Sequence, residues 1–153
     1  MIKYGILMID PPWNQRKGGL RKVRPRQNRN LDYPLMDIKD IFMLLDKEIF
    51  PKAKNNHCVF MWCIDKYLSE IDAWMFERGY RRHARFIWDK TNGIAPAFTI
   101  RFTHEYLIWY YKKKFLQIAK EMRGHFKDVF REESKKHSRK PDYAYKMVNL
   151  MYP

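Results

Sequence analysis

The stretch Ile6-Leu7-Met8-Ile9-Asp10-Pro11-Pro12-Trp13 decides the fold of this chain. Its first four residues form an apolar run that is typical of a buried strand. Proline has no backbone N–H for a strand ladder, so Pro11 and Pro12 end the strand and fix an extended turn. Hydrogen-bond acceptors therefore gather at the strand end. They are the Asp10 carboxylate and the carbonyls of the two prolines, beside the flat face of Trp13.

This group of acceptors suits the alkylation of a planar amine such as that of adenine. The amine lone pair is delocalised into the ring, and two acceptors on its hydrogens favour the tetrahedral geometry that attack requires. We therefore interpret Asp10 and the Pro11 carbonyl as acceptors for the amine, and Trp13 as a stacking surface for the base. The alternative interpretation is structural: a strand followed by a Pro-Pro turn, with a tryptophan in the core.

Outward from this stretch, hydrophobic periodicity predicts an α/β domain. The expected strands are residues 2–9, 58–64, 85–90 and 105–111, the last two forming a hairpin pair around a long connection. Expected helices span 38–50, with Asp37 as N-cap, and 66–78, ended by Gly79. A last helix should begin at Pro141, with an apolar stripe made of Ala144, Met147, Val148 and Met151.

The composition indicates a single globular domain over residues 1–153. Apolar residues make up 46% and aromatic residues 16%, which suffices for a core in a chain of 153 residues. The net charge of +14 indicates a polyanionic partner, most simply nucleic acid, with a membrane surface as the competing polyanion. No apolar run approaches a spanning helix and the N-terminus is no signal peptide, so we expect a soluble, cytoplasmic protein.

The two cysteines are expected to be reduced core residues. Cys58 and Cys63 lie five residues apart in one expected strand, so the pleat sends them to opposite faces. They are therefore poorly placed for a disulfide or a shared metal. We interpret neighbouring His57 as a strand-end histidine and predict no metal site.

Two basic regions interrupt the pattern. Residues 14–30 carry seven arginines and lysines and no acid, which predicts a mobile loop beside the base pocket. This loop is either a solvated surface loop or a lid that gathers phosphates, and we prefer the lid. Residues 112–140 are again basic and contain interleaved phenylalanines, which indicates a nucleic-acid surface or a solvated helix face. The loop residues expected at the substrate are Arg16, Lys17, Arg21 and Lys22.

The chain resembles the adenine-N6 methyltransferases related to the catalytic subunit of the messenger-RNA adenosine methyltransferase, a family with bacterial and phage members that act on DNA. The resemblance rests on an ordered set of motifs over nearly the whole chain. They are DPPW at 10–13, YPLM at 33–36, VFMW at 59–62, WDK at 88–90, THE at 103–105 and HSRKPD at 137–142. It implies a Rossmann-like fold with a mostly parallel sheet, a permuted motif order and S-adenosylmethionine as cofactor.

The resemblance also implies the remaining site residues. Those implied at the cofactor are Asp10, His137, Ser138 and Lys140, with the lysine beside a helix N-terminus contacting the methionine carboxylate. Those expected at the substrate are Tyr33, Lys90, Arg101, His104 and Glu105. Glu105 either holds Arg101 or His104 in place or pairs with a neighbouring arginine, and both readings are open.

In the family that this chain resembles, the cofactor-binding strand follows the last helix, whereas this sequence stops at Tyr152-Pro153. We therefore expect the sheet to lack that C-terminal strand, and no G-x-G-x-x-G replaces it elsewhere. Truncation, a strand supplied by another chain, and loss of catalysis are the three explanations. The intact DPPW motif and Lys140 argue against the last of them.

The expected function is transfer of a methyl group from S-adenosylmethionine to the N6 amine of adenine in nucleic acid, without metal. DNA is favoured over RNA because short stand-alone relatives are mostly bacterial or phage enzymes, and a base in a duplex must be flipped out. The alternative is a catalytically inactive nucleic-acid-binding subunit or scaffold. A basic inhibitor of a host enzyme has no specific support, and association with copies of itself or with other chains is open.

Overall fold

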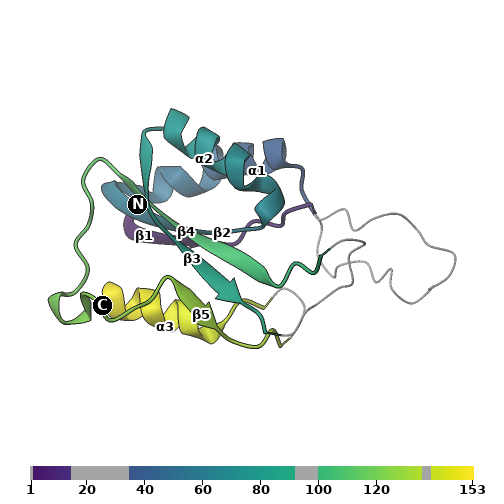
Figure 1. Ribbon diagram of the computed structural model, residues 1–153. Coiled ribbons are helices and arrows are strands. Elements are labelled where there is room, and N and C mark those ends of the chain that lie inside the picture. Colours follow the sequence, from purple (N-terminus) through teal and green to yellow (C-terminus); the bar gives the residue numbers. More distant parts are fainter. Residues whose placement is uncertain (1, 15–34, 92–99, 136–138) are drawn as a thin grey trace, which may run out of the picture.

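A computed structural model of the chain describes residues 2–14, 35–91, 100–135 and 139–153 (Figure 1). Its strands are β1 (Tyr4–Ile9), β2 (Ala53–Cys63), β3 (Tyr80–Asp89), β4 (His104–Lys112) and β5 (Val129–Arg131). Its helices are α1 (Ile38–Leu44), α2 (Leu68–Glu77) and α3 (Asp142–Met151). The α/β class and the predicted elements are therefore confirmed, and β5 is an element that the sequence did not indicate.

The five strands form one mixed sheet in the order β1-β2-β4-β3-β5. β1 pairs with β2, and β3 with β5, in parallel, whereas β4 is antiparallel to both β2 and β3. The expectation of a mostly parallel sheet is therefore wrong, because two of the four pairings between neighbouring described strands are antiparallel. The reason is the predicted hairpin pair: β3 and β4 are consecutive strands that pair antiparallel, which places one reversed strand in the middle of the sheet.

Helices cover both faces of this sheet. In Figure 1, α1 and α2 lie over one face and α3 lies against the other. The apolar positions of β2 alternate between the two resulting cores, with Val59, Met61 and Cys63 toward α1 and α2. Cys58, Phe60 and Trp62 face α3. The prediction that the two cysteines lie on opposite faces is confirmed, and both are buried free thiols.

The predicted helix over 38–50 follows its apolar stripe but changes its winding. After α1 the chain continues as a π-helical turn at Leu45–Ile49 and a 3-10 turn at Phe50–Lys52. Ile41 and Leu45 are buried as the periodicity predicted. Asp37 occupies the N-cap position without a capping hydrogen bond from its side chain.

The basic segment 112–140 is not a helix where the structure describes it. Between β4 and α3, the described residues form only a 3-10 turn at Lys120–Met122 and the short strand β5. The interpretation of this segment as a solvated helix face is therefore wrong. Val129, Phe130 and Arg131 are drawn into the sheet because Phe130 can bury its ring beside Trp88, its partner in the parallel ladder.

His57 lies within β2 and not at its end. The two nitrogens of its buried ring lie 2.7 Å from the Lys54 carbonyl oxygen and 2.8 Å from the Tyr80 hydroxyl. Burial lowers the pKa of His57. The described ranges contain no cluster of three or more metal-binding side chains. In the same ranges, no helix is long and apolar enough to cross a membrane.

Several predicted site residues lie outside the described ranges. They are the loop residues Arg16, Lys17, Arg21 and Lys22, together with Tyr33, His137 and Ser138. The lid interpretation of residues 14–30 and the implied cofactor contacts of His137 and Ser138 remain predictions.

Candidate active site

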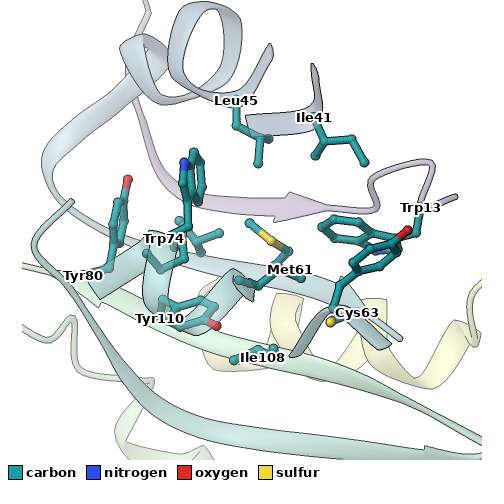
Figure 2. Close-up of a cluster of buried hydrophobic side chains, with 13 residues drawn as sticks. Trp13, Ile41, Leu45, Met61, Cys63, Trp74, Tyr80, Ile108 and Tyr110 are labelled. Carbon is teal, nitrogen blue, oxygen red and sulfur yellow. The ribbon is translucent and has the colours of Figure 1, made fainter. Parts of the chain in front are cut away.

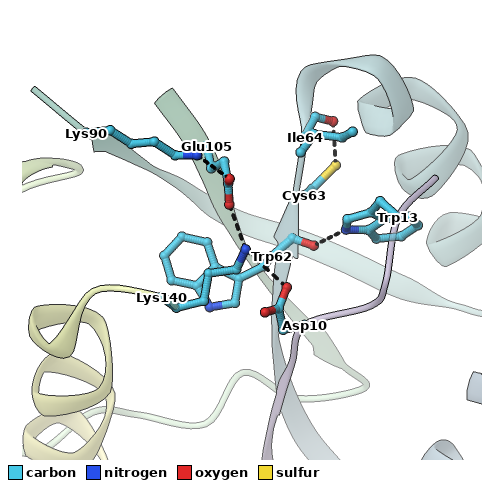
Figure 3. A network of polar contacts seen from close by, with 8 residues as sticks. All are labelled: Asp10, Trp13, Trp62, Cys63, Ile64, Lys90, Glu105 and Lys140. Carbon is cyan, nitrogen blue, oxygen red and sulfur yellow. Dashed lines mark hydrogen bonds and ion pairs between the residues drawn. The ribbon is translucent and has the colours of Figure 1, made fainter. Parts of the chain in front are cut away.

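The candidate site lies at the end of the sheet where β1, β2 and β3 finish and β4 begins. Alternation along these strands turns one set of side chains toward α3. Asp10 directly follows β1, Trp62 is near the end of β2, and Glu105 is the second residue of β4. Lys140 enters the same space from the residues just before α3, as Figure 3 shows. Ligands of α/β proteins commonly bind at such carboxyl ends of strands.

Lys140 connects the two acids of the site. Its Nζ lies 3.2 Å from Asp10 Oδ1 and 2.7 Å from Glu105 Oε2. The ammonium also lies 5.4 Å from the centre of the Trp62 ring, within cation–π range. The Lys140 side chain is only 11% exposed, whereas the Asp10 side chain is 37% exposed. Asp10 is therefore the part of this cluster that an outside molecule reaches most easily.

Lys90 completes the cluster from the end of β3. Its Nζ is paired with Glu105 Oε1, and it lies 5.0 Å from the centre of the Trp88 ring. Glu105 thus holds one lysine on each carboxylate oxygen. Two carboxylates and two ammonium groups balance formally, which explains how four charged side chains share one largely buried space.

Burial and the ion pairs of the cluster together determine the direction in which the pKa of each group shifts. Burial raises the pKa of Asp10, and this outweighs the opposing attraction of Lys140. Burial acts in the same direction on Glu105, but Lys140 and Lys90 together hold the pKa of its carboxyl below the usual value. The pKa of Lys140 is raised, because Glu105 and Asp10 outweigh the effect of its burial. Burial thus favours the protonated form of Asp10, whereas the two lysines favour the ionised form of Glu105.

The two proline carbonyls already have backbone partners. Trp13 N–H donates to the Pro11 carbonyl over 2.8 Å, and Met36 N–H donates to the Pro12 carbonyl over 3.1 Å. A carbonyl oxygen has two lone pairs, so the Pro11 carbonyl retains capacity for a second donor. The DPPW turn is thereby fixed to the chain segment that precedes α1.

Trp13 is a core residue in this structure. The residue is 5% exposed, and its ring packs against Tyr67 with ring centres 5.4 Å apart. Its Nε1 donates to the Trp62 carbonyl over 2.9 Å. Figure 2 shows the ring beside Ile41 and Cys63 in the core under α1 and α2. The observed contacts of Trp13 are thus those of the structural interpretation, a tryptophan in the core. Stacking on a base would require a conformational change that exposes its ring.

His104 and Glu105 do not share a cleft. They are neighbours at the start of β4, so their side chains point to opposite faces of the sheet. His104 Nε2 lies 2.9 Å from the Tyr106 hydroxyl, which donates to Asp65 over 3.4 Å on the α2 side. Within the described ranges, the ion pairs of Glu105 are with Lys90 and Lys140 and not with His104 or an arginine, so its contacts there match neither interpretation. Arg101 is exposed.

Two contacts at the candidate site were not predicted from the sequence. Trp62 lies under the Lys140 ammonium, and Glu132 accepts hydrogen bonds from the start of α3. Trp62 is the last residue of the VFMW motif, and its position near the end of a strand was the available signal. For Glu132 the sequence offered no signal, because its contact depends on how β5 and α3 are placed.

The sequence model of the family described as MT-A70 matches residues 4–153, which is nearly the whole chain. The matched span includes every charged residue of the site: Asp10, Lys90, Glu105 and Lys140. A search of curated proteins gave no match.

Proposed function

Because the chain belongs to the MT-A70 family of adenine-N6 methyltransferases, we propose that it methylates the N6 amine of adenine in nucleic acid. The family implies S-adenosylmethionine as the methyl donor and a Rossmann-like methyltransferase fold. One observation carries the proposal for this chain. The partly exposed Asp10 carboxylate is held at the carboxyl end of β1 by a buried lysine, where an amine can donate to it.

The charged residues suit a zwitterionic amino-acid group such as the methionine part of S-adenosylmethionine. A buried ammonium and a more exposed carboxylate lie side by side in Lys140 and Asp10. Lys140 would hold the carboxylate of the cofactor, and Asp10 would be shared between cofactor and amine. When bound, S-adenosylmethionine supplies a methyl group on a positively charged sulfur.

The protein residues would act on the amine by accepting its hydrogens. Asp10 and the second lone pair of the Pro11 carbonyl are the proposed acceptors, and both stabilise positive charge that develops on the nitrogen. Because the pKa of Asp10 is raised, its carboxylate is also a better proton acceptor than an ordinary aspartate. Trp13 is proposed to keep the turn rigid, through its buried ring and its bond to the Trp62 carbonyl.

Glu105 is proposed to keep Lys140 and Lys90 in place through its two carboxylate oxygens. We propose that Lys90 and Arg101, with the basic residues Arg16, Lys17, Arg21 and Lys22, contact phosphate or base. The net charge of +14 supports a polyanionic substrate. DNA is our preferred substrate over RNA. A cytoplasmic location is part of the same proposal.

The test of this function uses the protein with methyl-labelled S-adenosylmethionine and matched DNA and RNA oligonucleotides. Digestion to nucleosides and mass spectrometry should find label in N6-methyladenine, more from DNA than from RNA. Label only in RNA would overturn the substrate preference while leaving the chemistry intact. Salt-sensitive binding of nucleic acid without S-adenosylmethionine binding or label would instead indicate a non-catalytic binding subunit.

A further inference from the structure

Glu132 connects the β3–β5 edge of the sheet to the start of α3. Its two carboxylate oxygens accept hydrogen bonds from the backbone N–H groups of Asp142 and Tyr143, each over 3.1 Å. The backbone of the same residue is anchored to β3. Its carbonyl accepts from Trp88 Nε1 over 2.7 Å, and its N–H donates to the Asp89 carbonyl over 3.3 Å.

Helix α3 needs this outside acceptor. The first N–H groups of a helix have no partner within the helix, and a polar side chain at the N-cap usually accepts from one of them. Here the N-cap is Pro141, whose side chain holds no acceptor. Glu132 replaces the missing cap with a charged carboxylate, which the positive end of the helix also favours.

This cap lies beside the site, because Lys140 directly precedes Pro141. The Lys140 backbone is therefore fixed by the helix start, while its ammonium is fixed by Asp10 and Glu105. The carboxylate of Glu132 also fills the helix N-terminus. A cofactor carboxylate is consequently left to the lysine side chain and not to the helix N–H groups.

We infer that Glu132 is a positioning residue, whose carboxylate sets the start of α3 and thereby holds the Lys140 ammonium between Asp10 and Glu105. Glu132 itself touches none of these three side chains in the contacts described. Its effect on cofactor affinity rests on the proposed function, whereas its effect on Lys140 does not.

The first experiment measures the position of Lys140 without any cofactor. Glu132→Ala and Glu132→Gln are compared with Glu133→Gln, which makes the same charge change at the exposed neighbouring residue. The readout is the rate of reductive methylation of each lysine, followed by mass spectrometry under native conditions. In Glu132→Ala the Lys140 rate should rise about five- to tenfold, while exposed Lys146 on the same helix stays constant. Glu132→Gln should fall between Glu132→Ala and the wild type, because an amide retains one acceptor.

A second measurement separates positioning from general loosening of the fold. In Glu132→Ala, formate should restore protection of Lys140, because a free carboxylate can occupy the vacated helix N-terminus. Chloride at the same ionic strength should not restore it. Equal Lys140 labelling in Glu132→Ala and wild type overturns the inference, and so does uniform acceleration at all lysines that formate leaves unchanged.

Calorimetry with S-adenosylmethionine then connects this role to the site. Glu132→Ala should weaken binding about five- to tenfold, and Glu133→Gln should not change it. If the wild type binds no S-adenosylmethionine while Lys140 labelling responds as expected, the proposed cofactor fails and the positioning role stands. Unchanged affinity in Glu132→Ala, beside a wild type that binds, overturns the link from helix cap to cofactor.

Discussion

The Asp10 carboxylate, directly after β1, lies 3.2 Å from the Lys140 ammonium, which precedes α3, so residues far apart in the sequence meet in one ion pair. The pair stands at the carboxyl end of the sheet, above the Trp62 ring. Glu105 shares the same lysine at 2.7 Å. A single ammonium therefore organises both acids of the proposed methyltransferase site.

Replacement of Lys140 by methionine should lower the free energy of unfolding by about 3 kcal/mol, because two buried or partly buried carboxylates lose a shared partner. Binding of S-adenosylmethionine should fall below detection in calorimetry. The control is Lys146→Met on the exposed side of α3, which should change stability by less than about 0.5 kcal/mol. Equal changes in the free energy of unfolding for the two substitutions would show that the Lys140 ion pairs contribute no net stability.

The response to acid should depend on Glu105. Its folded pKa is lowered, so the stability that it contributes is present above its unfolded pKa of about 4.3 and is lost as pH falls through the folded value. Urea unfolding of wild type and Glu105→Gln at several pH values measures this. The stability difference should be about 3 kcal/mol near pH 7 and shrink below pH 4. A difference that stays constant down to pH 3 would contradict the paired state of Glu105.

The two acids of the site should titrate with opposite shifts from their ordinary pKa values. Burial raises the pKa of Asp10, whereas Lys140 and Lys90 hold the pKa of Glu105 below its usual value, so the two midpoints should move in opposite directions from the ordinary values of their residue types. Carboxyl carbon chemical shifts in a pH titration by NMR can resolve the two, with Asp10→Asn used for assignment. We expect the Asp10 midpoint above the usual aspartate value and the Glu105 midpoint below the usual glutamate value, and a shift of either in the other direction would refute the description of the cluster.

Trp13 should behave as a structural residue in stability measurements. Trp13→Phe keeps an aromatic ring but loses the Nε1 hydrogen bond to the Trp62 carbonyl, which should cost about 1 kcal/mol. Trp13→Ala leaves a cavity beside Tyr67 and should cost about 3–5 kcal/mol. Phe76→Ala, at a half-exposed ring on α2, is the control and should cost much less. Unchanged stability in Trp13→Ala would restore base stacking as its main role.

Local patterns were enough to predict most of the fold. The stripe containing Ile41 and Leu45 and the stripe of α3 reappear as buried faces. The apolar run before Asp10 forms the predicted strand but is only partly buried, because β1 lies at an edge of the sheet formed by the described residues. The short strand β5 could not be read from the sequence, because three residues carry no periodicity and their pairing is set by Trp88 and its neighbours. The reversed strand β4 followed from the hairpin, but its place between β2 and β3 depends on the whole sheet.

The sequence indicated single residues of the candidate site, but not the contacts between them. Asp10 and Lys140 were identified from motifs, yet their mutual contact depends on the meeting of distant elements. The separation of His104 from Glu105 could have been inferred from strand alternation alone. The cap by Glu132 could not, because a proline N-cap gives no hint of which outside residue replaces it.

The central claim is that Asp10 accepts the target amine, and one comparison tests it most directly. Wild type and Asp10→Asn are incubated with labelled S-adenosylmethionine and adenine-containing DNA, and N6-methyladenine is measured beside salt-dependent DNA binding. We expect label from the wild type, a loss of at least about a hundredfold in Asp10→Asn, and DNA binding that is nearly unchanged. Equal label from both proteins, or label from neither, would contradict the account.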